Sequence, residues 1–385
     1  MNRGLFTRMK AGLVLSGGGA RGAYQVGVLK AIAECQPKHA HNPFSIISGT
    51  SSGAINAVAL AASANNFRLA VKKVEKIWRT LHVDKVYESG VFDLMKSGGR
   101  LMGSLLNRGT GTGRPIALLN NDPLRELLSH SIQFRNIQKR IDSGFLDAVA
   151  ITASGYSSGE SVSFFQGIPQ IKKWRRTRSV GVPTILNEDH LLASSAIPTI
   201  FPAQKVNREF FGDGSLRQLS PISPVIHMGA KRILVIGVSG QTKNPPRAHD
   251  RTDSPSLAHM VGHVFKCAFI DSLEADIEHL LRVNALIREL EAKHYDAERG
   301  QLRHIDFLAI NPSLQFDEIA DKHVRDLPAG MRALMKVTGA TGGKGGASMA
   351  SYLLFEPEFC RELIDQGYQD AMNQEQEILA FLKGE

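Results

Sequence analysis

Residues 47–57, ISGTSSGAINA, place Ser51 inside the pattern G-x-S-x-G. The residues before it, 44–48 (FSIIS), are mostly apolar and predict a short buried strand. The small side chains of residues 52–64 predict a helix that can lie close to a sheet. A tight turn between a strand and a helix is the geometry that exposes a nucleophilic serine. The stretch therefore predicts an α/β fold with Ser51 at the C-terminal edge of a sheet.

The rest of the chain continues the alternation of strand and helix. Residues 13–15 (LVL) predict a buried strand that ends at a run of glycines, and apolar spacing over 20–34 predicts a helix. Strand–helix repeats of this kind favour a parallel sheet. Further strands are expected at 146–165 (as a hairpin), 209–211, 233–238 and 305–310, and helices at 65–82, 257–293 and 358–382. Irregular structure is expected at 88–115, 241–256 and 338–347, which are rich in glycine or polar residues.

The chain contains G-x-S-x-G a second time, at residues 155–159 (GYSSG). In a chain this rich in glycine the pattern is expected by chance roughly 0.2 times, so the motif alone is weak evidence. Ser157 lies between two alternating stretches, where Gly and Ser supply the geometry of a hairpin turn. Ser51, with a strand before it and a helix after it, is therefore the candidate nucleophile.

A glycine-rich segment, residues 17–22 (GGGARG), follows the first predicted strand and opens the first predicted helix. Glycine lets the backbone approach a ligand closely, and the amides of such a turn can form an oxyanion hole. The segment also fits G-x-G-x-x-G, the fingerprint of dinucleotide binding, which requires an acidic residue about twenty positions further on. Residues 36–42 (QPKHAHN) contain none, which disfavours a nucleotide.

The sequence offers several candidates for a general base. Asp213 lies between Gly212 and Gly214 after an apolar stretch, although an Asp-Gly pair is also a common turn. His190 and His227 follow Ser51 in the chain, and the order Ser, Asp, His would match that of α/β-hydrolases. Neither histidine lies in a distinctive context, so the residues alone leave the choice open.

Four ordered blocks together resemble the patatin-like phospholipases. They are GGGARG (17–22), GTSSG (49–53), ASSAIPTIFPA (193–203) and GDG (212–214), and the match continues through SPISP (220–224) and GAKRIL (229–234). The resemblance covers residues 10–240, which it identifies as the catalytic domain. It implies a three-layer α/β/α fold with a mainly parallel central sheet. It also implies a mostly helical C-terminal region, 241–385, that packs on or completes that domain.

The resemblance further implies an activity. A patatin-like chain would be a serine lipid acyl hydrolase of phospholipase A, lysophospholipase or esterase type. Ser51 would be the nucleophile, Asp213 the base that takes its proton, and no histidine, metal or cofactor would be needed. The oxyanion hole would consist of the amides of Gly17, Gly18, Gly19 and Arg21. The alternative is a non-catalytic regulatory module on the same fold that binds a nucleotide or a membrane.

The sequence departs from the family pattern at two places. Ser52 stands where the family usually has Ala, and residues 215–217 (SLR) replace a more usual run that begins with glycine and is apolar. We expect these differences to affect substrate preference, since they leave Ser51 and Asp213 in place. Head group and acyl length therefore stay open.

The chain is basic, with 46 Lys and Arg against 37 Asp and Glu and a formal net charge of +9 at pH 7, which favours an anionic partner. Its hydrophobic content of 43% excludes a disordered chain. Residues 172–178 (KKWRRTR) concentrate the basic charge without a nucleic-acid-binding motif around them. We expect peripheral contact with an anionic membrane through Lys172, Lys173, Trp174, Arg175, Arg176 and Arg178. Three scattered cysteines, and no evident signal peptide or transmembrane segment, predict a cytoplasmic protein that works at the inner face of the membrane.

Overall fold

The computed structural model describes residues 10–90, 117–240, 257–267, 272–292, 303–337 and 346–384, together with Phe269 and a few single residues between 92 and 115. The three segments predicted to be irregular, 88–115, 241–256 and 338–347, lie wholly or largely outside these residues.

One sheet runs through the described chain. Its ten strands are β1 (Ala11–Leu15), β2 (Ile46–Thr50), β3 (Ala148–Gly155), β4 (Ser161–Gly167), β5 (Trp174–Arg176), β6 (Ser179–Pro183), β7 (Gln204–Val206), β8 (Glu209–Asp213), β9 (Arg232–Ile236) and β10 (Asp306–Ile310). Their order is β10-β9-β1-β2-β3-β4-β6-β5, with β8 paired to β3 and β7 paired to β8. The strands from β10 to β3 are parallel, and the β3–β4 hairpin then reverses the direction. The predicted mainly parallel sheet is confirmed.

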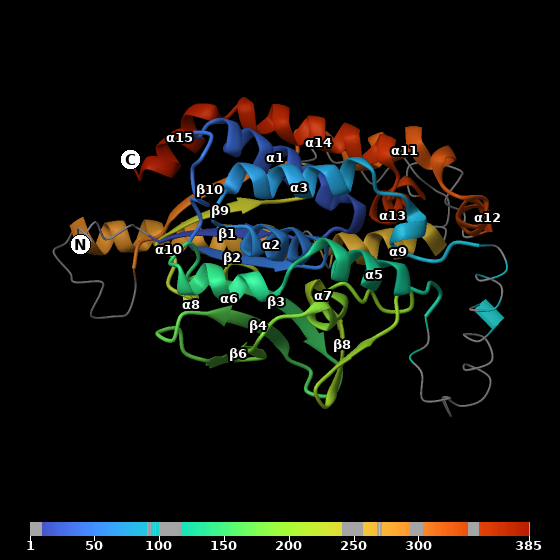
Figure 1. Cartoon of the computed structure of the whole chain (residues 1–385), viewed down its shortest axis with the longest axis horizontal. Coiled ribbons are helices and arrows are strands. Elements are labelled where there is room, and N and C mark those ends of the chain that lie inside the picture. Colours follow the sequence, from blue (N-terminus) through green and yellow to red (C-terminus); the bar gives the residue numbers. More distant parts are fainter. Residues whose placement is uncertain are drawn as a thin grey trace.

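Helices cover both faces of this sheet (Figure 1). They are α1 (Gly22–Glu34), α2 (Ser52–Ala62), α3 (Phe67–Arg79), α5 (Asp122–Ser131), α6 (Arg135–Asp142), α7 (Glu188–Ser194), α8 (Ser223–His227), α9 (Leu257–Lys266), α10 (Ser272–Ala292), α11 (Phe316–His323), α12 (Ala329–Val337), α13 (Gly346–Leu353), α14 (Pro357–Met372) and α15 (Glu375–Lys383). Short 3-10 turns include η1 (Gly19–Arg21), η2 (Val83–Lys85), η3 (Gly214–Leu216) and η7 (Val324–Asp326).

The alternation of side chains along each strand divides the core into two layers. Leu13 and Leu15 belong to the apolar cluster that joins α1, α2, α3 and α14 to one face. Val14, between them, belongs to the cluster that joins α8 and α10 to the other face. β1 thus buries both faces, as parallel strands do in α/β folds. The predicted three-layer α/β/α architecture is confirmed.

The C-terminal region shares the core of the preceding residues. α14 crosses α1 so closely that a Cβ on Gly27 would lie 1.9 Å from the carbonyl oxygen of Ile364, and one on Gly367 would lie 2.2 Å from that of Tyr24. β10 adds a parallel strand to the sheet beside β9. Glycine at both crossing points therefore lets the two helices, about 340 positions apart in the chain, pack backbone to backbone.

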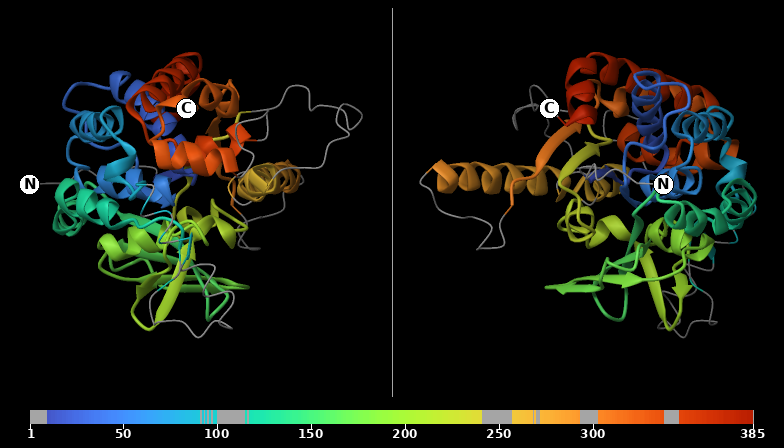
Figure 2. Two further views of the ribbon diagram at one scale, coloured as in Figure 1. Left: turned by 90° about the vertical axis from the view of Figure 1, so that its right-hand side faces the viewer. Right: turned by 60° about the vertical axis from the view of Figure 1, so that its left-hand side comes forward.

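The helix predicted over 257–293 is found as α9 and α10. Cys267 and Phe269, the described residues between them, are π-helical. Phe265 and Phe269 both pack against the Tyr352 ring, at centroid distances of 5.2 and 5.3 Å. α10 projects beyond the rest of the molecule (Figure 2). Helical periodicity predicted the helical residues of both α9 and α10.

Candidate active site

Ser51 lies at the turn from β2 into α2, with φ 55° and ψ −128°. A positive φ is unfavourable for a residue with a Cβ and persists only where the surroundings impose it. The two glycines of the motif impose it by close packing. A Cβ on Gly49 would lie 2.3 Å from the carbonyl oxygen of Gly53, and one on Gly53 would lie 2.2 Å from that of Leu15. The structure therefore gives G-x-S-x-G the geometry of a nucleophile elbow.

The last residue of α7, Ser194, and the segment after it hold this elbow in place. The backbone amide of Ser51 donates to Ser194 Oγ at 2.8 Å, and the Ser194 hydroxyl donates to the carbonyl of Thr152 at 2.6 Å. The amide of Asp213 donates to the carbonyl of Ala196 at 2.8 Å. Block 193–203, predicted only as part of a resemblance, thus connects Ser51 with the strand that carries Asp213.

Asp213 ends β8, opposite Ala153 of β3, and its side chain is fully buried. Gly214 is needed because a Cβ there would lie 2.1 Å from the carbonyl oxygen of Thr152, whereas one on Gly212 would lie 2.8 Å from the hydroxyl of the exposed Tyr156 side chain. The Asp213 Oδ1 accepts a hydrogen bond from the Ser215 amide at 2.9 Å. Oδ2 is buried and accepts no well-formed hydrogen bond among the described residues.

The electrostatic state of Asp213 follows from this position. Burial raises the pKa of its carboxyl from 3.8 to about 6, because the charged form loses its hydration. The Ser51 hydroxyl lowers the pKa most among the groups that oppose burial, followed by the amide and hydroxyl of Ser215. Ser51 thus lies close enough to stabilise the carboxylate, although the contact falls short of a well-aligned hydrogen bond, as apo enzymes commonly show. A carboxyl with a pKa near 6 can take up and return a proton near neutral pH.

The glycine segment before α1 borders Ser51 directly. A Cβ on Gly17 would lie 3.0 Å from the Cβ of Ser51 and 2.6 Å from the Ser215 hydroxyl. Gly19 has φ 57°, and a Cβ there would lie 2.1 Å from the carbonyl oxygen of Tyr352. Among the contacts of the described residues, the amides of Gly17 and Gly18 have no hydrogen-bond acceptor. These amides are thus available to a ligand beside Ser51.

Arg21 differs from the three glycines. Its amide donates to the carbonyl of Gly18 at 3.2 Å, so in this conformation it is not free for a ligand. Its buried guanidinium pairs with Asp317 at 2.6 Å, donates to Ser351 Oγ at 2.9 Å and lies 4.0 Å from the centre of the Tyr352 ring. The side chain therefore ties η1 to α11 and α13 and fixes the glycine turn from behind.

The remaining candidates lie elsewhere. His190 is buried, bonds to Asn187 at the start of α7 and packs edge-on against Phe164. The His227 ring stacks on Trp174 and accepts from Arg176 Nε at 3.2 Å. Burial lowers the pKa of both rings. Within the described contacts neither ring hydrogen-bonds to Ser51 or Asp213.

The second serine motif has a structural role. Ser157 is exposed in the turn between β3 and β4, as the hairpin pattern predicted. Its amide donates to the Glu209 carboxylate at 2.8 Å. The turn thus supports β8 from outside the site, and only the first motif meets Asp213.

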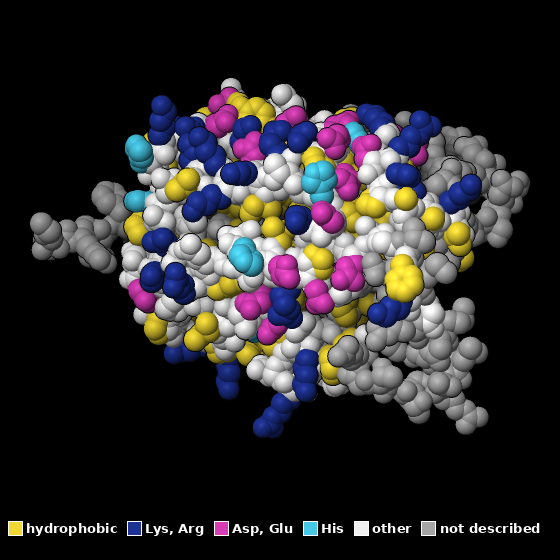
Figure 3. All heavy atoms as spheres, turned by 45° about the vertical axis from the view of Figure 1, so that its right-hand side comes forward, with side chains coloured by type: hydrophobic (Ala, Val, Ile, Leu, Met, Phe, Trp, Pro, Cys, Tyr) yellow, Lys and Arg dark blue, Asp and Glu magenta, His cyan; other side chains and the backbone are white. Residues whose placement is uncertain are grey.

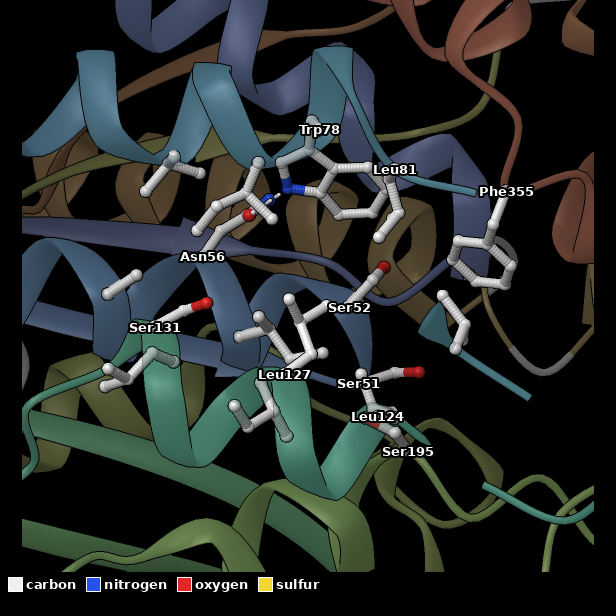
Figure 4. Close-up of a pocket in the computed structure, with 18 of the residues that line it drawn as sticks. Ser51, Ser52, Asn56, Trp78, Leu81, Leu124, Leu127, Ser131, Ser195 and Phe355 are labelled. Atoms are coloured by element: carbon white, nitrogen blue, oxygen red, sulfur yellow. Dashed lines mark hydrogen bonds between the residues drawn. The ribbon is translucent and has the colours of Figure 1, made fainter. Parts of the chain in front are cut away.

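An apolar cavity opens beside Ser51. It lies between α2, α3 and α5, and most of its lining side chains are apolar. Figure 4 shows Ser51 at one end and Ser131 at the other, with Leu124 near Ser51 and with Leu127 and Trp78 on opposite sides of the space. The polar Asn56 is satisfied by Trp78 Nε1, which donates to it at 2.8 Å. The space suits a hydrocarbon chain whose polar end lies at Ser51.

A family model for patatin-like phospholipases matches residues 13–226, more than half of the chain. The chain belongs to the patatin-like phospholipase family. This membership supports lipid acyl hydrolysis as the general class of activity, with a lipid as substrate. A search of curated proteins finds no significant match.

Two solved structures illustrate what the patatin-like chain is similar to. VipD from Legionella pneumophila is 12% identical with a TM-score of 0.38, over 98% of this chain and 67% of that one. Human GIVD cytosolic phospholipase A2, in complex with methyl gamma-linolenyl fluorophosphonate, is 12% identical with a TM-score of 0.38. There the match covers 100% of this chain and 62% of that one, so this chain spans less than two thirds of the human enzyme. At these scores the family assignment rests on the family model alone.

The basic stretch 172–178 does not form one surface. Lys173 and Arg175 line a depression with Val162 and Phe164, on the side of β4 that faces the main core. Arg176 and Arg178 line a groove on the opposite side. Successive side chains of a strand point to opposite faces of the sheet, so Arg175 and Arg176 lie on opposite sides of β5. β5 is the edge strand of the sheet. Lys and Arg also protect an exposed sheet edge against pairing with another chain.

Charge is unevenly distributed over the surface. Figure 3 shows Lys and Arg projecting from the lower edge of the molecule, whereas both signs alternate over the rest of that face. None of the helices in the described ranges combines the length and apolar character that crossing a membrane requires.

Proposed function

We propose that the protein is a serine hydrolase of lipid acyl esters, of phospholipase A, lysophospholipase or esterase type, with Ser51 as nucleophile and Asp213 as its base. The observation that supports this most is the juxtaposition of a strained serine, a fully buried carboxyl and an apolar cavity. Each alone has a structural explanation, but together they supply a nucleophile, a proton acceptor and room for an acyl chain.

The chemistry proceeds in two halves. The Asp213 carboxylate takes the proton of the Ser51 hydroxyl as Oγ attacks the acyl carbonyl carbon. The oxyanion that forms is stabilised by amides of Gly17, Gly18 and Gly19. The bond to the leaving alcohol then breaks, the alcohol oxygen receives the proton from Asp213, and an acyl-serine remains. Water repeats the sequence on the acyl-serine and releases a fatty acid.

The raised pKa of Asp213 suits both the formation and the hydrolysis of the acyl-serine. A carboxylate with a pKa of about 6 is a stronger base than an exposed aspartate, yet it stays ionised at neutral pH. The Ser215 amide at Oδ1 fixes the orientation of the carboxylate, which leaves Oδ2 for the serine proton. These groups make a third catalytic residue unnecessary.

The experiment compares hydrolysis of a short-chain p-nitrophenyl ester and of mixed phospholipids by the wild type, Ser51→Ala and Asp213→Asn. Loss of Ser51 should lower turnover by a factor on the order of 10⁶, as in other serine hydrolases. Asp213→Asn should be nearly as inactive. Ser157→Ala, which alters the second motif, is the matched control and should retain full activity. A fully active Ser51→Ala variant would support the regulatory-module alternative instead.

Access to lipid requires contact with a lipid surface, and we propose that Lys172, Lys173 and Arg175 contribute to it. Lys173 and Arg175 are exposed, and so are the apolar Ile185 and Phe210, at 80% and 38%. Basic side chains beside exposed apolar ones favour an anionic bilayer. Sedimentation with phosphatidylglycerol vesicles at low salt should pellet the wild type and less of a Lys173→Gln, Arg175→Gln double variant. Equal pelleting of the two would remove these residues from the contact.

A further inference from the structure

A second groove lies on the side of the sheet away from the acyl cavity. It holds about 1480 Å³ out to its open mouth. β4, β6 and α8 border it and lie together at one end of the molecule (Figure 1). The residues of this polar groove are Ser154, Ser161, Ser163, Arg176, Thr177, Arg178, Ser179, Leu216, Arg217, Gln218, Leu219, Ser220, Ser223, Pro224 and His227.

Serine hydroxyls form the floor of the polar groove. Ser161 pairs with Ser154 on one side and with Ser179 on the other, so three adjacent strands point a serine to the same face. Ser154 and Ser161 are largely buried, at 7% and 4% exposure. Within the described hydrogen bonds these two hydroxyls have no side-chain partner. Buried hydroxyls without protein partners at the base of a groove can donate to a ligand.

Arginines form the rim. Arg176 donates through Nε to His227, which leaves its other N–H groups for a ligand. Arg217 donates one N–H to the carbonyl of Gly159 at 3.1 Å. Arg178, in the turn with φ 58°, has no acidic partner among the described residues. Three guanidinium groups therefore share one groove.

No Asp or Glu lines the polar groove within the described part of the chain. Glu160 pairs with Arg175 at 2.6 Å and lines the depression on the other side. Asp276 does not line the polar groove, but its carboxylate accepts from the Ile222 amide at 2.8 Å and hydrogen-bonds to Ser220 of the lining. Burial lowers the pKa of His227 most, and its hydrogen bond to Ser223 raises it. The charged groups that act on this pKa are Arg176 and Arg303, and both lower it. The charged side chains that line the polar groove are thus all basic, and Asp276 borders it behind Ser220.

We propose that the polar groove binds a phosphate-bearing anion, with the arginines on its oxygens and the serine hydroxyls beneath. Guanidinium groups bind phosphate through paired N–H donors, and hydroxyls complete its hydrogen bonds. Sulfate would fit the same donors, but phosphate monoesters and diesters are the class that carries both charge and an organic group. This anion is a second ligand, since Asp213 and the acyl cavity lie on the other face of the sheet.

The polar groove also connects to the elbow. Gln218 lines it, accepts a hydrogen bond from the Thr50 hydroxyl at 2.5 Å and donates to Thr152 at 3.1 Å. Thr50 precedes Ser51, and η3, which begins one residue after Asp213, leads into Arg217 and Gln218. An anion that orders residues 216–220 would therefore act on the segment that positions Asp213.

The test measures binding of inorganic pyrophosphate to the full chain by isothermal titration calorimetry. Arg176→Gln and Arg178→Asn should each weaken binding by about tenfold or more, since each removes a charge-assisted hydrogen bond. Asn is chosen at 178 because it tolerates a left-handed backbone. Arg175→Gln is the matched control, because it removes the same charge from the same strand on the opposite face. It should bind as the wild type does.

Two further arms identify the source of the phosphate. If phosphatidylglycerol vesicles bind through Arg176 and Arg178, and pyrophosphate displaces them, the ligand is a lipid headgroup; exposed Leu216 and Leu219 at the rim would then meet the bilayer. If pyrophosphate binds but the binding of vesicles does not depend on these arginines, the ligand is a soluble phosphate ester.

If Arg176→Gln or Arg178→Asn does not fold, as judged by thermal unfolding, Ser161→Ala replaces it and should also weaken binding. Absence of pyrophosphate binding, or equal loss in Arg175→Gln, would overturn the proposal.

Discussion

Replacing Asp213 by Asn should stabilise the protein while abolishing its activity. The carboxyl has a pKa of 3.8 when exposed and about 6 in the fold. At about 1.4 kcal/mol for each pH unit, keeping the carboxylate ionised in the folded state costs about 3 kcal/mol. The side chain is fully buried, so solvent does not screen this cost. Asn has the same shape, carries no charge and keeps an oxygen for the Ser215 amide.

The size of the effect depends on pH. A carboxyl whose pKa is raised on folding costs nothing below its unfolded value, because it is then protonated in both states. The cost grows between pH 4 and pH 6 and is complete above pH 6. At pH 8, Asp213→Asn should therefore raise the free energy of unfolding by up to about 3 kcal/mol, whereas near pH 4 the two proteins should be alike.

Thermal unfolding across pH measures this difference. With an unfolding entropy of about 2.1 cal/mol/K per residue, a gain of 3 kcal/mol corresponds to about 4 °C in the midpoint for a chain of this length. Asp84→Asn, at an exposed carboxyl, is the control and should change stability by less than about 0.5 kcal/mol. A variant less stable than the wild type at pH 8, or a gain independent of pH, would refute the argument from burial.

Three further outcomes are expected. Hydrolysis by the wild type should fall about tenfold per pH unit below about pH 6, because protonated Asp213 is no base; activity that stays flat down to pH 4.5 would contradict this. Ser194→Ala removes the hydroxyl that accepts from the Ser51 amide, and should cost about 1–3 kcal/mol of stability and lower kcat more than it changes KM. Leu127→Trp fills the middle of the acyl cavity, so long-chain esters should react more slowly while a p-nitrophenyl acetate assay is unchanged; equal loss on both substrates would place the acyl chain elsewhere.

The elbow could be predicted well because the residues that form it are adjacent in the sequence. An apolar strand, two glycines and a run of small residues leave few other ways for residues 44–64 to fold. The same reasoning separated Ser51 from Ser157, which the structure places in an exposed hairpin turn. The geometry of the elbow and the choice of Ser51 over Ser157 could both be predicted from the residues immediately around each serine.

Partners distant in sequence could not be predicted this way. Asp213 meets Ser51 because β8 pairs with β3, and no residue near an Asp-Gly pair encodes that pairing. The role of Ser194 had no signal at all, since a hydroxyl that accepts from a backbone amide looks like any other serine. Only the resemblance of the whole set of blocks suggested that these segments belong together.

The basic stretch illustrates a missed local signal. Residues 174–176 form an edge strand, and strand alternation sends Arg175 to one face and Arg176 to the other. Had residues 174–183 been recognised as a short hairpin, the sequence would have predicted two basic surfaces.

The most direct test of the central claim is covalent labelling of the wild type with a fluorophosphonate, followed by peptide mass spectrometry. We expect one adduct, on Ser51, that disappears in Ser51→Ala and forms far more slowly in Asp213→Asn. An adduct on another serine, or none at all from a protein that hydrolyses lipid esters, would contradict the assignment of the nucleophile.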